Sequence, residues 1–423
     1  MTSQEGELEN LVCSRPVVVL DFGSLVTKAG FCGEDTPTTF PTLVGLKDED
    51  ETPSKTSDLS EDTVNRTFSA GYEAQKNRSK LTLINPVKRG IVEDWDAMEK
   101  LFEFAFDEVL DVLPESTPVL IADSPRNTKE NRERIVKLLF EKFRVESCYV
   151  AMDSVLSLFS SGRTTGITVE SGEDLTSAVP IFEGYALRHS IEHLDVAGSA
   201  LSNFLFHKLS SKSLELSRFD HMDLVWYFFF NTHIHTHTHT HTTHQVRQIK
   251  ESFCEILLDF DGTKKKSMAS FLKEYELPDG QVIAVSQRSC WECGEALFFP
   301  STILGKSDSV MSRSSAYEGR GITEITTRAL LHCDTELRQV LYEEIVPTGG
   351  TSMIPGFSKR LESEIRGLAP PSSQVCVNPD SQRKYAAWIG GSMMSSLTTF
   401  ADMEISKQDF DDNEGKCVHQ KCF

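Results

Sequence analysis

The sequence predicts an α/β protein of two lobes, built on a duplicated strand–turn–strand unit. Residues 17–20 form a short apolar, β-branched run that enters a turn at residues 21–24, the pattern of a buried strand before a tight turn. Residues 166–169 run in the same way into residues 170–173, and residues 176–182 have the pattern of the returning strand. An acidic residue precedes the glycine turn in both units, which indicates a duplicated fold.

Strand and helix patterns alternate between the two units. Residues 119–122 have the pattern of a strand, and residues 128–143 have that of an amphipathic helix. One face of this helix is apolar: Ile135, Leu138, Leu139 and Phe143. Such alternation favours parallel pairing, a sheet covered on both faces, and a ligand site at the strand ends.

Composition favours a soluble globular protein. The chain has 423 residues, of which 39% are hydrophobic and 25% charged, enough for two domains or two lobes. Its formal net charge of −20 would repel polyphosphate, so we expect basic partners and no broad nucleic-acid-binding surface. Residues 1–10 lack the features of a secretory signal, and the longest apolar stretch, near residues 225–230, is too short to cross a membrane.

The ten cysteines are scattered from Cys13 to Cys422. Cys290 and Cys293 form the only C-x-x-C pair, and a zinc site would require a second matching pair, which the sequence lacks. We therefore expect reduced thiols and no zinc at this pair.

Two segments interrupt the α/β pattern. Residues 47–62 contain almost no apolar residue and predict a solvated, mobile loop. Residues 231–244 alternate Thr and His and contain six of the twelve histidines. Alternating CA nucleotides encode Thr and His, and removing residues 226–245 would join residues 223–225 to residues 246–250 in one helical pattern. We interpret 226–245 as a non-native low-complexity insert from a retained intron; zinc or nickel binding by the imidazoles is the alternative.

Longer motifs occur in the order in which actin has them. Residues 21–24 and 28–31 resemble the first phosphate loop of actin, and residues 161–166 resemble the stretch that leads into its second. The further motifs are Tyr-Glu-Leu-Pro-Asp-Gly-Gln at 275–281, Thr-Gly-Gly-Thr at 348–351, Arg-Lys-Tyr at 383–385, Trp-Ile-Gly-Gly-Ser at 388–392 and Lys-Cys-Phe at 421–423. The chain thus resembles the actin family over nearly its whole length. Among divergent actin-related proteins, those of the male germ line are the most similar in keeping this ending.

The resemblance implies the fold that actin shares with sugar kinases and heat-shock chaperones. This fold has two lobes of duplicated ribonuclease-H-like topology, divided into four subdomains. Subdomain 1 would comprise residues 1–41, 86–160 and 387–423, and subdomain 2 residues 42–85. Subdomain 3 would comprise residues 161–196 and 306–386, and subdomain 4 residues 197–305.

The resemblance also implies a site for ATP or ADP with magnesium. Such a site needs backbone N–H groups in glycine turns, a lysine, and acidic residues that position the metal. At the phosphates we expect Asp21, Gly23, Ser24, Lys28, Glu170 and Gly172, with Asp21 and Glu170 holding magnesium through water and Gly172 giving close backbone approach. Around the adenosine we expect Arg247, Lys250 and Glu251 on one wall and Gly349, Gly350, Met353 and Lys384 on the other. Taken singly, Lys250 and Glu251 also suit an ordinary helix surface.

The sequence departs from the actin pattern at the phosphates. Glu170, Gly172, Glu173 and Asp174 stand where actin has Asp, Gly, Asp and Gly. Asp174 therefore adds a carboxylate and removes a residue that tolerates positive φ, so we expect weaker nucleotide affinity. Phe22 and Leu25 make the first turn bulkier as well.

The catalytic positions also differ. Asp153 and Ser177 stand where actin holds the attacking water with a glutamine and a histidine. An aspartate can orient water, but its shorter reach and its added charge near the phosphates argue against efficient turnover. We expect very slow or absent ATP hydrolysis.

Two regions that actin uses for filament assembly are altered. Residues 46–69 are longer and acidic, and residues 306–321 are expanded and rich in Ser, Arg and Gly, so we expect no actin-like filaments. The cleft between subdomains 1 and 3 keeps an apolar character that suits an amphipathic helix of an actin-binding protein. Its residues are Phe159, Gly162, Thr164, Gly184, Ile389, Met393, Met394, Leu397 and Met403. Each of these side chains equally suits the interior of a lobe.

The leading function is an actin-related cytoskeletal or assembly scaffold with its nucleotide in a structural role. We expect a monomer or a subunit of a hetero-assembly, in the cytoplasm and cytoskeleton, with no direct nucleic-acid contact and no membrane insertion. The alternatives are an ATP-hydrolysing, filament-forming actin and an actin-related subunit of a nuclear chromatin-remodelling complex.

Overall fold

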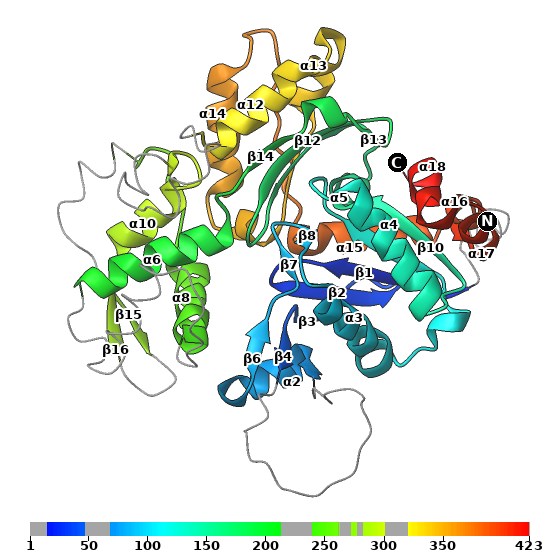
Figure 1. The fold of residues 1–423 in the computed structure, drawn as a ribbon. Helices are drawn as coiled ribbons and strands as arrows, with labels where there is room; N and C mark the ends of the chain where they lie inside the picture. Colours follow the sequence, from blue (N-terminus) through cyan, green and yellow to red (C-terminus); the bar gives the residue numbers. More distant parts are fainter. Residues whose placement is uncertain are drawn as a thin grey trace, which may run out of the picture.

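Two lobes, each built around a β-sheet, make up the computed structural model (Figure 1). The structure describes residues 15–46, 68–212, 239–260, 262, 272–276, 282–300 and 320–422. The predicted loop at 47–62, most of the interpreted insert at 226–245 and most of the altered region at 306–321 lie outside the described residues.

The first sheet has the strand order β18-β10-β9-β1-β2-β3. Its strands are β1 (Val18–Phe22), β2 (Val26–Phe31), β3 (Thr38–Pro41), β9 (Val119–Asp123), β10 (Ser147–Met152) and β18 (Ile405–Ser406). β1, β9 and β10 are parallel, as predicted, whereas β2, β3 and β18 pair in the antiparallel sense. β2 and β3 are antiparallel because short connections join each to the preceding strand, and a tight turn can only reverse the chain.

The second sheet repeats this arrangement. Its order is β13-β12-β11-β17, with β14 also paired to β12. The strands are β11 (Gly166–Ser171), β12 (Thr176–Phe182), β13 (Tyr185–Ala186), β14 (Glu192–Leu194) and β17 (Ile345–Thr348). β11 forms a hairpin with β12 and pairs in parallel with β17, just as β1 does with β2 and β9. The predicted duplication of the strand–turn–strand unit is confirmed.

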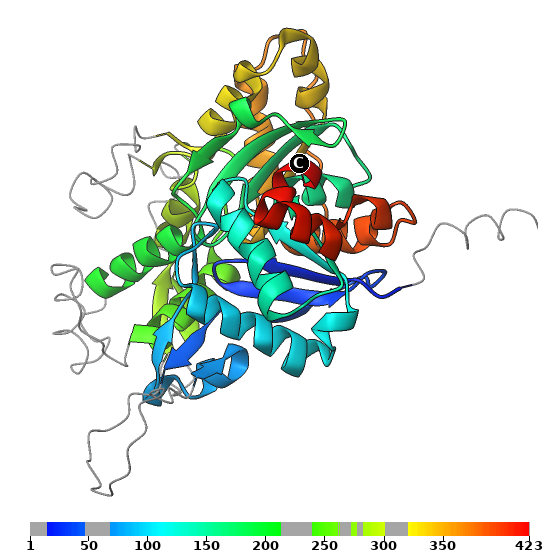
Figure 2. The same ribbon diagram turned by 45° about the vertical axis from the view of Figure 1, so that its right-hand side comes forward.

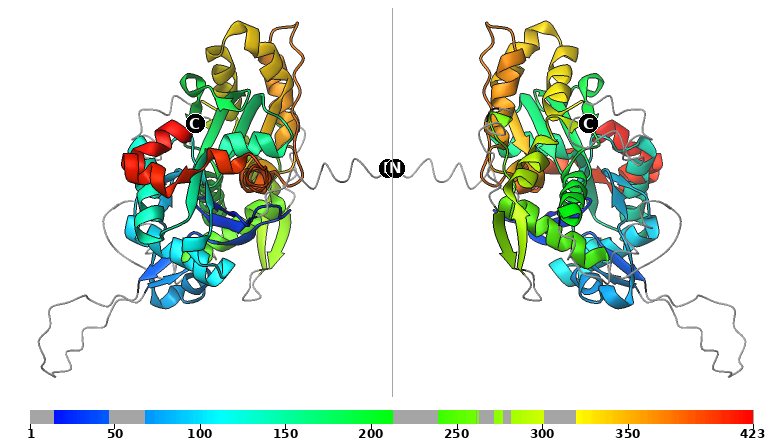
Figure 3. Two further views of the ribbon diagram at one scale, coloured as in Figure 1. Left: turned by 90° about the vertical axis from the view of Figure 1, so that its right-hand side faces the viewer. Right: turned by 90° about the vertical axis from the view of Figure 1, so that its left-hand side faces the viewer.

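Helices and three small sheets complete the lobes. The longer helices are α3 (Trp95–Phe104), α4 (Lys129–Lys137), α5 (Asp153–Ser160), α6 (Gly198–Lys212), α8 (His239–Phe253), α10 (Gln287–Glu295), α12 (Ile322–His332), α13 (Thr335–Glu343), α14 (Phe357–Leu368), α15 (Ala386–Ser395) and α17 (Lys407–Asn413). The small sheets join β4 (Val44–Leu46), β5 (Phe68–Ala70) and β6 (Thr82–Ile84), then β7 (Val87–Lys88) and β8 (Ile91–Val92), then β15 (Leu272–Glu276) and β16 (Val282–Ser286). In both side views the sheet of β4 to β6 lies at the opposite end of the molecule from α12 to α14 (Figure 3).

The helix predicted at residues 128–143 is present but changes its winding. Thr128 caps α4, because its hydroxyl oxygen accepts the backbone N–H of Asn131 at 3.2 Å. After Lys137 the chain continues as a π-helical turn, η5 (Leu138–Lys142). The wider turn keeps Leu139 buried on the core side.

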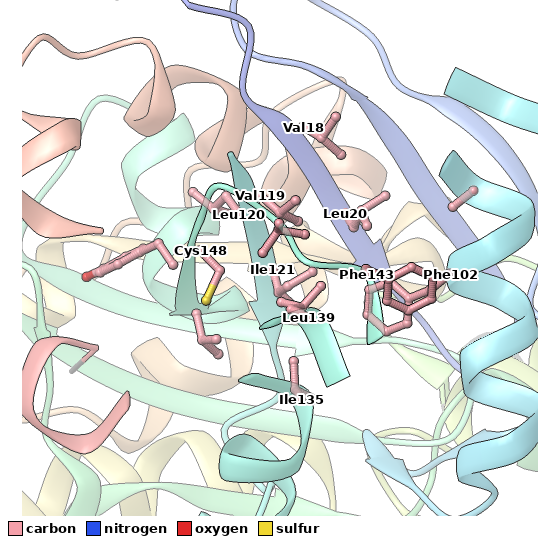
Figure 4. Packing of buried hydrophobic residues seen from close by; sticks show 14 of the residues in the cluster. Val18, Leu20, Phe102, Val119, Leu120, Ile121, Ile135, Leu139, Phe143 and Cys148 are labelled. Carbon is pink, nitrogen blue, oxygen red and sulfur yellow. The ribbon is translucent and has the colours of Figure 1, made fainter. Parts of the chain in front are cut away.

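The first-lobe core lies between the sheet and helices α3 and α4. Figure 4 shows Val18 and Leu20 of β1, Val119 of β9 and Phe102 of α3, which belong to this core. All four side chains are fully buried. The β-branched run of β1 therefore forms a strand because its side chains are covered by apolar groups on both sides.

Two crossing helices, α5 and α15, carry the chain between the lobes. α5 connects β10 of the first sheet to β11 of the second, and α15 follows β17 and returns the chain to the first lobe. Their close packing requires Gly390, since a Cβ there would lie 1.8 Å from the backbone oxygen of Leu156. Trp388, fully buried on α15, donates its indole N–H to the Val19 carbonyl at 3.0 Å. The Trp-Ile-Gly-Gly-Ser motif thus fixes α15 against both α5 and β1.

Each lobe has its own apolar cluster. The first cluster gathers residues between Val17 and Leu156 with residues from Trp388 to Cys422, and the second gathers residues between Ile167 and Val377. Seen from the side, the C-terminal helices lie against the α4 face of the first lobe (Figure 2). The boundaries of the four subdomains stay a prediction. Within the described parts of the chain, no helix has the length and apolar character needed to span a membrane.

Candidate functional site

A cavity of about 990 Å³ opens between the lobes where β1 and β11 end. Residues from both lobes line it. Every residue predicted for a nucleotide, metal or catalytic role is among them: Asp21, Gly23, Ser24, Lys28, Asp153, Glu170, Gly172, Ser177, Arg247, Lys250, Glu251, Gly349, Gly350, Met353 and Lys384. The structure therefore brings together residues from nearly the whole length of the chain, from Asp21 to Lys384.

The first loop is held rigidly at the cavity. Lys28 lies opposite Asp21 in the β1–β2 register, and its Nζ is 2.8 Å from Asp21 Oδ2. The Thr42 hydroxyl donates to the Gly23 carbonyl at 2.7 Å, and the Asn85 amide donates to the Ser24 carbonyl. Gly23 itself is needed, because a Cβ there would come within 2.9 Å of the Val26 carbonyl oxygen. Strand pairing and these bonds leave the Ser24 side chain on the cavity wall.

Phe22 obstructs the cavity less than its size suggests. Its ring packs against Phe102 of α3, with 4.7 Å between the ring centroids. It is a partly buried side chain at the edge of the first-lobe core as well as part of the cavity wall. The bulkier residue in the first turn is therefore accommodated mainly by packing.

The second loop is a tight turn braced by two neighbours. The Gly172 N–H donates to the Leu175 carbonyl at 2.9 Å, and the Gly172 carbonyl accepts from Gly198 N–H at 3.0 Å and the Thr351 hydroxyl at 2.7 Å. A Cβ at Gly172 would meet only the Leu175 oxygen at 3.5 Å, an ordinary contact. Within the fold itself, glycine is not required here, so its bare backbone matters only to a ligand in the cavity.

Asp174 adopts an ordinary backbone conformation in the second loop. Neither Asp174 nor Gly172 adopts a positive φ. The closing bond from Gly172 to Leu175 forms a turn in which an aspartate fits without the left-handed conformation. What remains of the predicted effect is the added carboxylate.

Three carboxylates surround Lys28 at the deep end of the cavity. Burial alone would lower the pKa of Lys28, but the negative charges of Asp21, Glu170 and Asp153 outweigh it and raise that pKa. Burial and the neighbouring Asp21 raise the pKa of Glu170 to about 7, partly offset by Lys28. Burial and Glu170 raise the pKa of Asp153 well above its usual range. This end of the cavity thus holds more acidic groups than Lys28 alone can neutralise.

This acidic end fits a hydrated divalent cation. Glu170 Oε2 is buried and has no hydrogen-bond partner within the described structure. Among the residues that the structure describes, no three His, Cys, Asp or Glu side chains are placed to hold a metal ion together. The predicted pair, Asp21 and Glu170, would accordingly act through water molecules, the arrangement that Mg²⁺ tolerates best.

The opposite end of the cavity suits a planar, largely apolar group. Gly350 faces open space, since a Cβ there would meet no atom within 4 Å. Met353 is 39% exposed beside it, and the ammonium group of Lys384 lies over the Tyr385 ring, with Nζ 5.5 Å from the ring centroid. By contrast, Gly349 is needed by the fold, because its φ is +85° and a Cβ would lie 2.4 Å from the Ser171 oxygen.

The side chains of α8 on the cavity wall also form hydrogen bonds and ion pairs with other parts of the protein. Lys250 is buried and its Nζ donates to the Gly198 carbonyl at 2.7 Å, so it is not an ordinary helix-surface lysine. Arg247 pairs with Glu173 of the second loop at 2.8 Å, although its Nε is buried and has no partner in the described structure. Glu251 is exposed at the cavity rim.

The two candidate catalytic residues lie on opposite lobes of the cavity. Asp153 begins α5 and accepts the Ser154 hydroxyl at 2.9 Å. Ser177 is buried on β12, directly opposite Glu170 in the β11–β12 register. Burial and the neighbouring Glu170 raise the pKa of Asp153, which favours its protonated form over the ionised form that a general base needs.

The predicted partner cleft divides into two groups of residues. Ile389, Met394 and Met403 pack against the first-lobe core, which is the alternative that the sequence left open. Met393 and Leu397, on and just after α15, are 42% and 38% exposed. An incoming helix would therefore find two apolar side chains.

The remaining cleft residues form turns beside α15. Gly162 and Gly184 both adopt a positive φ, and the Gly184 N–H donates to the Thr164 carbonyl at 2.7 Å. Phe159 is half-buried near the end of α5. These backbone contacts give the rim of the cleft a fixed shape.

Sequence reasoning missed the contacts that join the lobes beneath the cavity. Asp195 pairs with Arg126 at 3.0 Å and with Arg89 at 3.6 Å. One signal was available: Arg89 precedes Gly90 in a two-residue turn, and both adopt the positive φ that such a hairpin requires.

Comparison with known families agrees with this geometry. The family model described as Actin matches residues 13–423. The chain therefore belongs to the actin family, whose proteins generally bind nucleotide with magnesium. The actin-type fold follows from the same match.

Proposed function

We propose that this protein is an actin-related scaffold that binds adenine nucleotide with magnesium in a structural role. The observation that carries the proposal is the cavity itself: both lobes contribute to its wall, so a ligand that fills it holds them together. The glycine-lined end at Gly350 and Met353 would take the adenosine, and Ser24 and Lys28 would contact phosphate. Asp21 and Glu170 would hold the hydrated magnesium.

Slow or absent hydrolysis follows from the residues near the phosphates. Hydrolysis needs a group that orients water and accepts its proton. Asp153 has a raised pKa, and Ser177 has no acid–base function at neutral pH. A bound nucleotide would thus remain unhydrolysed and would stabilise the fold.

The test is thermal unfolding of the full chain with and without ATP or ADP and magnesium. Ligand that binds only the folded state raises the midpoint temperature with concentration. Gly350→Leu is the matched variant, because Gly350 lines the cavity and a Cβ added there would meet no protein atom within 4 Å. We expect nucleotide to stabilise the native protein and not the Gly350→Leu variant, while both unfold at similar temperatures without ligand. An equal rise in the unfolding temperature of both proteins, or no rise in the native protein, would refute the proposed nucleotide pocket.

We propose further that the protein works through partners and not as a filament. Met393 and Leu397 offer the apolar contacts for an amphipathic helix of an actin-binding or other cytoskeletal protein. Its place would be the cytoplasm and cytoskeleton, as a monomer or in a hetero-assembly. Sedimentation with ATP and magnesium should leave it in the supernatant; a filament-forming actin would pellet. Capture from separate nuclear and cytoplasmic extracts distinguishes this role from that of a chromatin-remodelling subunit.

A further inference from the structure

A second, smaller pocket lies apart from the nucleotide cavity and shares no lining residue with it. Its volume is about 300 Å³, at the lower limit of small-molecule sites. Both lobes contribute to its wall, since α4 and α18 (Val418–Lys421) belong to the first lobe, and β13 and the short helix η6 (Arg188–Ser190) belong to the second. We call it the basic pocket, and its wall consists of Lys129, Tyr185, Ala186, Arg188, His419 and Cys422.

Charge distinguishes the basic pocket from the nucleotide cavity. Three of the side chains in its wall are basic and none is acidic, although the whole chain has a formal net charge of −20. Within the parts of the chain that the structure describes, neither Lys129 nor Arg188 forms an ion pair or a side-chain hydrogen bond. Cations that both lobes direct to one pocket without a protein partner are suited to bind an anion.

Two carboxylates close to the basic pocket are already engaged. His419 Nε2 is 3.0 Å from Glu133 Oε1 on α4, and Asp123 Oδ2 accepts from Arg132 Nε at 2.5 Å. Partial burial and the positive charge of Arg132 lower the pKa of Arg188, and Asp123 offsets this only in part. The Arg188 guanidinium therefore lacks a counter-charge, which an anion in the pocket would supply.

Contacts within each lobe hold the walls of the basic pocket in place. Cys422 Sγ accepts the Val150 N–H of β10 at 3.3 Å, which holds the end of α18 against the first sheet. Ala186 pairs with Ile181 in the β12–β13 register of the second sheet. The two unpaired cations thus come from supports that belong to different lobes, so a ligand that both of them hold also links the lobes.

The ligand that suits this arrangement is a small phosphate. A carboxylate is planar, and one guanidinium can engage both of its oxygens. A phosphate is tetrahedral and carries more charge, so it can accept hydrogen bonds from an ammonium and a guanidinium that approach from different directions.

We propose that the basic pocket binds inorganic phosphate or a small phosphate monoester between Lys129 and Arg188. The ligand links the two lobes at a place separate from the nucleotide cavity. This site does not depend on the proposed function, because it binds phosphate whether or not the nucleotide cavity is filled.

The experiment is a calorimetric titration of the full chain with inorganic phosphate and with glycerol 3-phosphate, at constant ionic strength, with and without ADP and magnesium. We expect saturable binding and an unfolding temperature that rises with ligand concentration. Lys129→Gln and Arg188→Gln each remove the charge of one exposed side chain, and each should weaken the affinity by about tenfold or more. Tighter binding of inorganic phosphate would identify the free ion as the ligand, and tighter binding of glycerol 3-phosphate would identify a monoester.

Arg366→Gln is the matched control. It removes the same charge from an exposed side chain on α14 that does not line the basic pocket. Its affinity for phosphate should stay within about twofold of that of the native protein. An equal loss of affinity in Arg366→Gln and Arg188→Gln would reveal a general effect of net charge and overturn the site.

Other results would also overturn the proposal. One is the absence of saturable binding of either phosphate ligand, and another is unchanged affinity in both Lys129→Gln and Arg188→Gln. Loss of phosphate binding when ADP and magnesium are added would place the phosphate in the nucleotide cavity instead. The response to ADP alone tests the nucleotide site separately, and the unliganded unfolding temperature reports on the folding of each variant.

Discussion

Arg360 on α14 and Glu295 on α10 form a buried ion pair, with 2.9 Å between Arg360 Nη2 and Glu295 Oε1. Their side chains are only 6% and 5% exposed. The Arg360 guanidinium also donates to Glu364 at 2.7 Å and lies over the Phe298 ring. This arrangement joins two helices of the second lobe through one fully engaged side chain.

Removing one partner of this pair should be costly. Arg360→Met leaves the Glu295 carboxylate buried without its cation, and we expect the free energy of unfolding to fall by about 3–5 kcal/mol. The Glu295→Leu/Arg360→Met double variant should lose less than Arg360→Met alone, because no charge is left buried. Urea unfolding measures both.

The surface pair Arg366–Glu362 provides the control. Arg366 is 61% exposed, so Arg366→Met should change the free energy of unfolding by no more than about 0.5 kcal/mol. Equal losses in Arg360→Met and Arg366→Met would contradict the importance of burial.

Glycine substitutions should distinguish the helix crossing from an ordinary helix. Gly390→Ala places a Cβ 1.8 Å from the Leu156 carbonyl oxygen and must separate α5 from α15. We expect a loss of about 3 kcal/mol or more in stability, seen as a clear drop in unfolding temperature. Gly367→Ala, on α14, meets no atom within 4 Å and should stabilise by about 0.5–1 kcal/mol. A neutral Gly390→Ala would mean that the two helices can separate freely.

Asp409 should make stability depend on pH at the acidic end. Its carboxylate is hydrogen-bonded by Lys421 and Ser406, and these contacts lower its pKa from 3.8 to about 2. Because the folded state favours the ionised form, the stabilisation is present above pH 3.8 and is lost as the pH falls towards 2. The side chain is partly solvent-exposed, so we expect Asp409→Asn to cost only about 1 kcal/mol at pH 7.

Denaturant unfolding at pH 7 and pH 3 checks the direction of this pH dependence. The difference in the free energy of unfolding between the native protein and Asp409→Asn should be smaller at pH 3 than at pH 7. Asp411→Asn, which breaks an exposed pair with Lys407, should show a smaller effect at both pH values. A difference that grows at pH 3 would be inconsistent with a lowered pKa.

The Thr-His repeat can be tested by deletion. Residues 226–245 have no periodic apolar face that a core would need, so we expect the chain without them to unfold at the same or a higher temperature and to give more soluble protein. Deletion of α6, which carries the buried residues Leu201 and Leu205, should abolish folding. Loss of folding in the first deletion would show that the repeat belongs to the native protein.

The sequence predicted the local elements of the fold well. The strand expected at residues 176–182 has the same bounds in β12, because its apolar alternation and flanking turns both constrain it. The π-helical turn after Lys137 escaped prediction, since it keeps Leu139 on the same apolar face that a regular helix would. The local sequence pattern thus predicted the positions of these elements, but not the change from an α-helix to a π-helical turn.

The sequence predicted which residues line the site, but not the hydrogen bonds and ion pairs that they form. Motif resemblance brought Lys250 and Arg247 to the cavity, but their bonds to Gly198 and Glu173 depend on segments about 50 and 70 positions away in the sequence. The bridge from Asp195 to Arg126 likewise spans 69 positions. Nothing in one sequence marks such partners, because charged residues of both signs occur throughout the chain.

The bond between Trp388 and Val19 also bears on how the chain is made. The second cluster of apolar residues ends at Val377, whereas the first needs residues up to Cys422 as well as those from Val17 onward. During synthesis, the lobe encoded in the middle of the chain can complete itself before the lobe that is begun first. Until Trp388 leaves the ribosome, the face of β1 that carries Val19 lacks its covering helix α15, and such exposed apolar surface makes a nascent chain prone to aggregation.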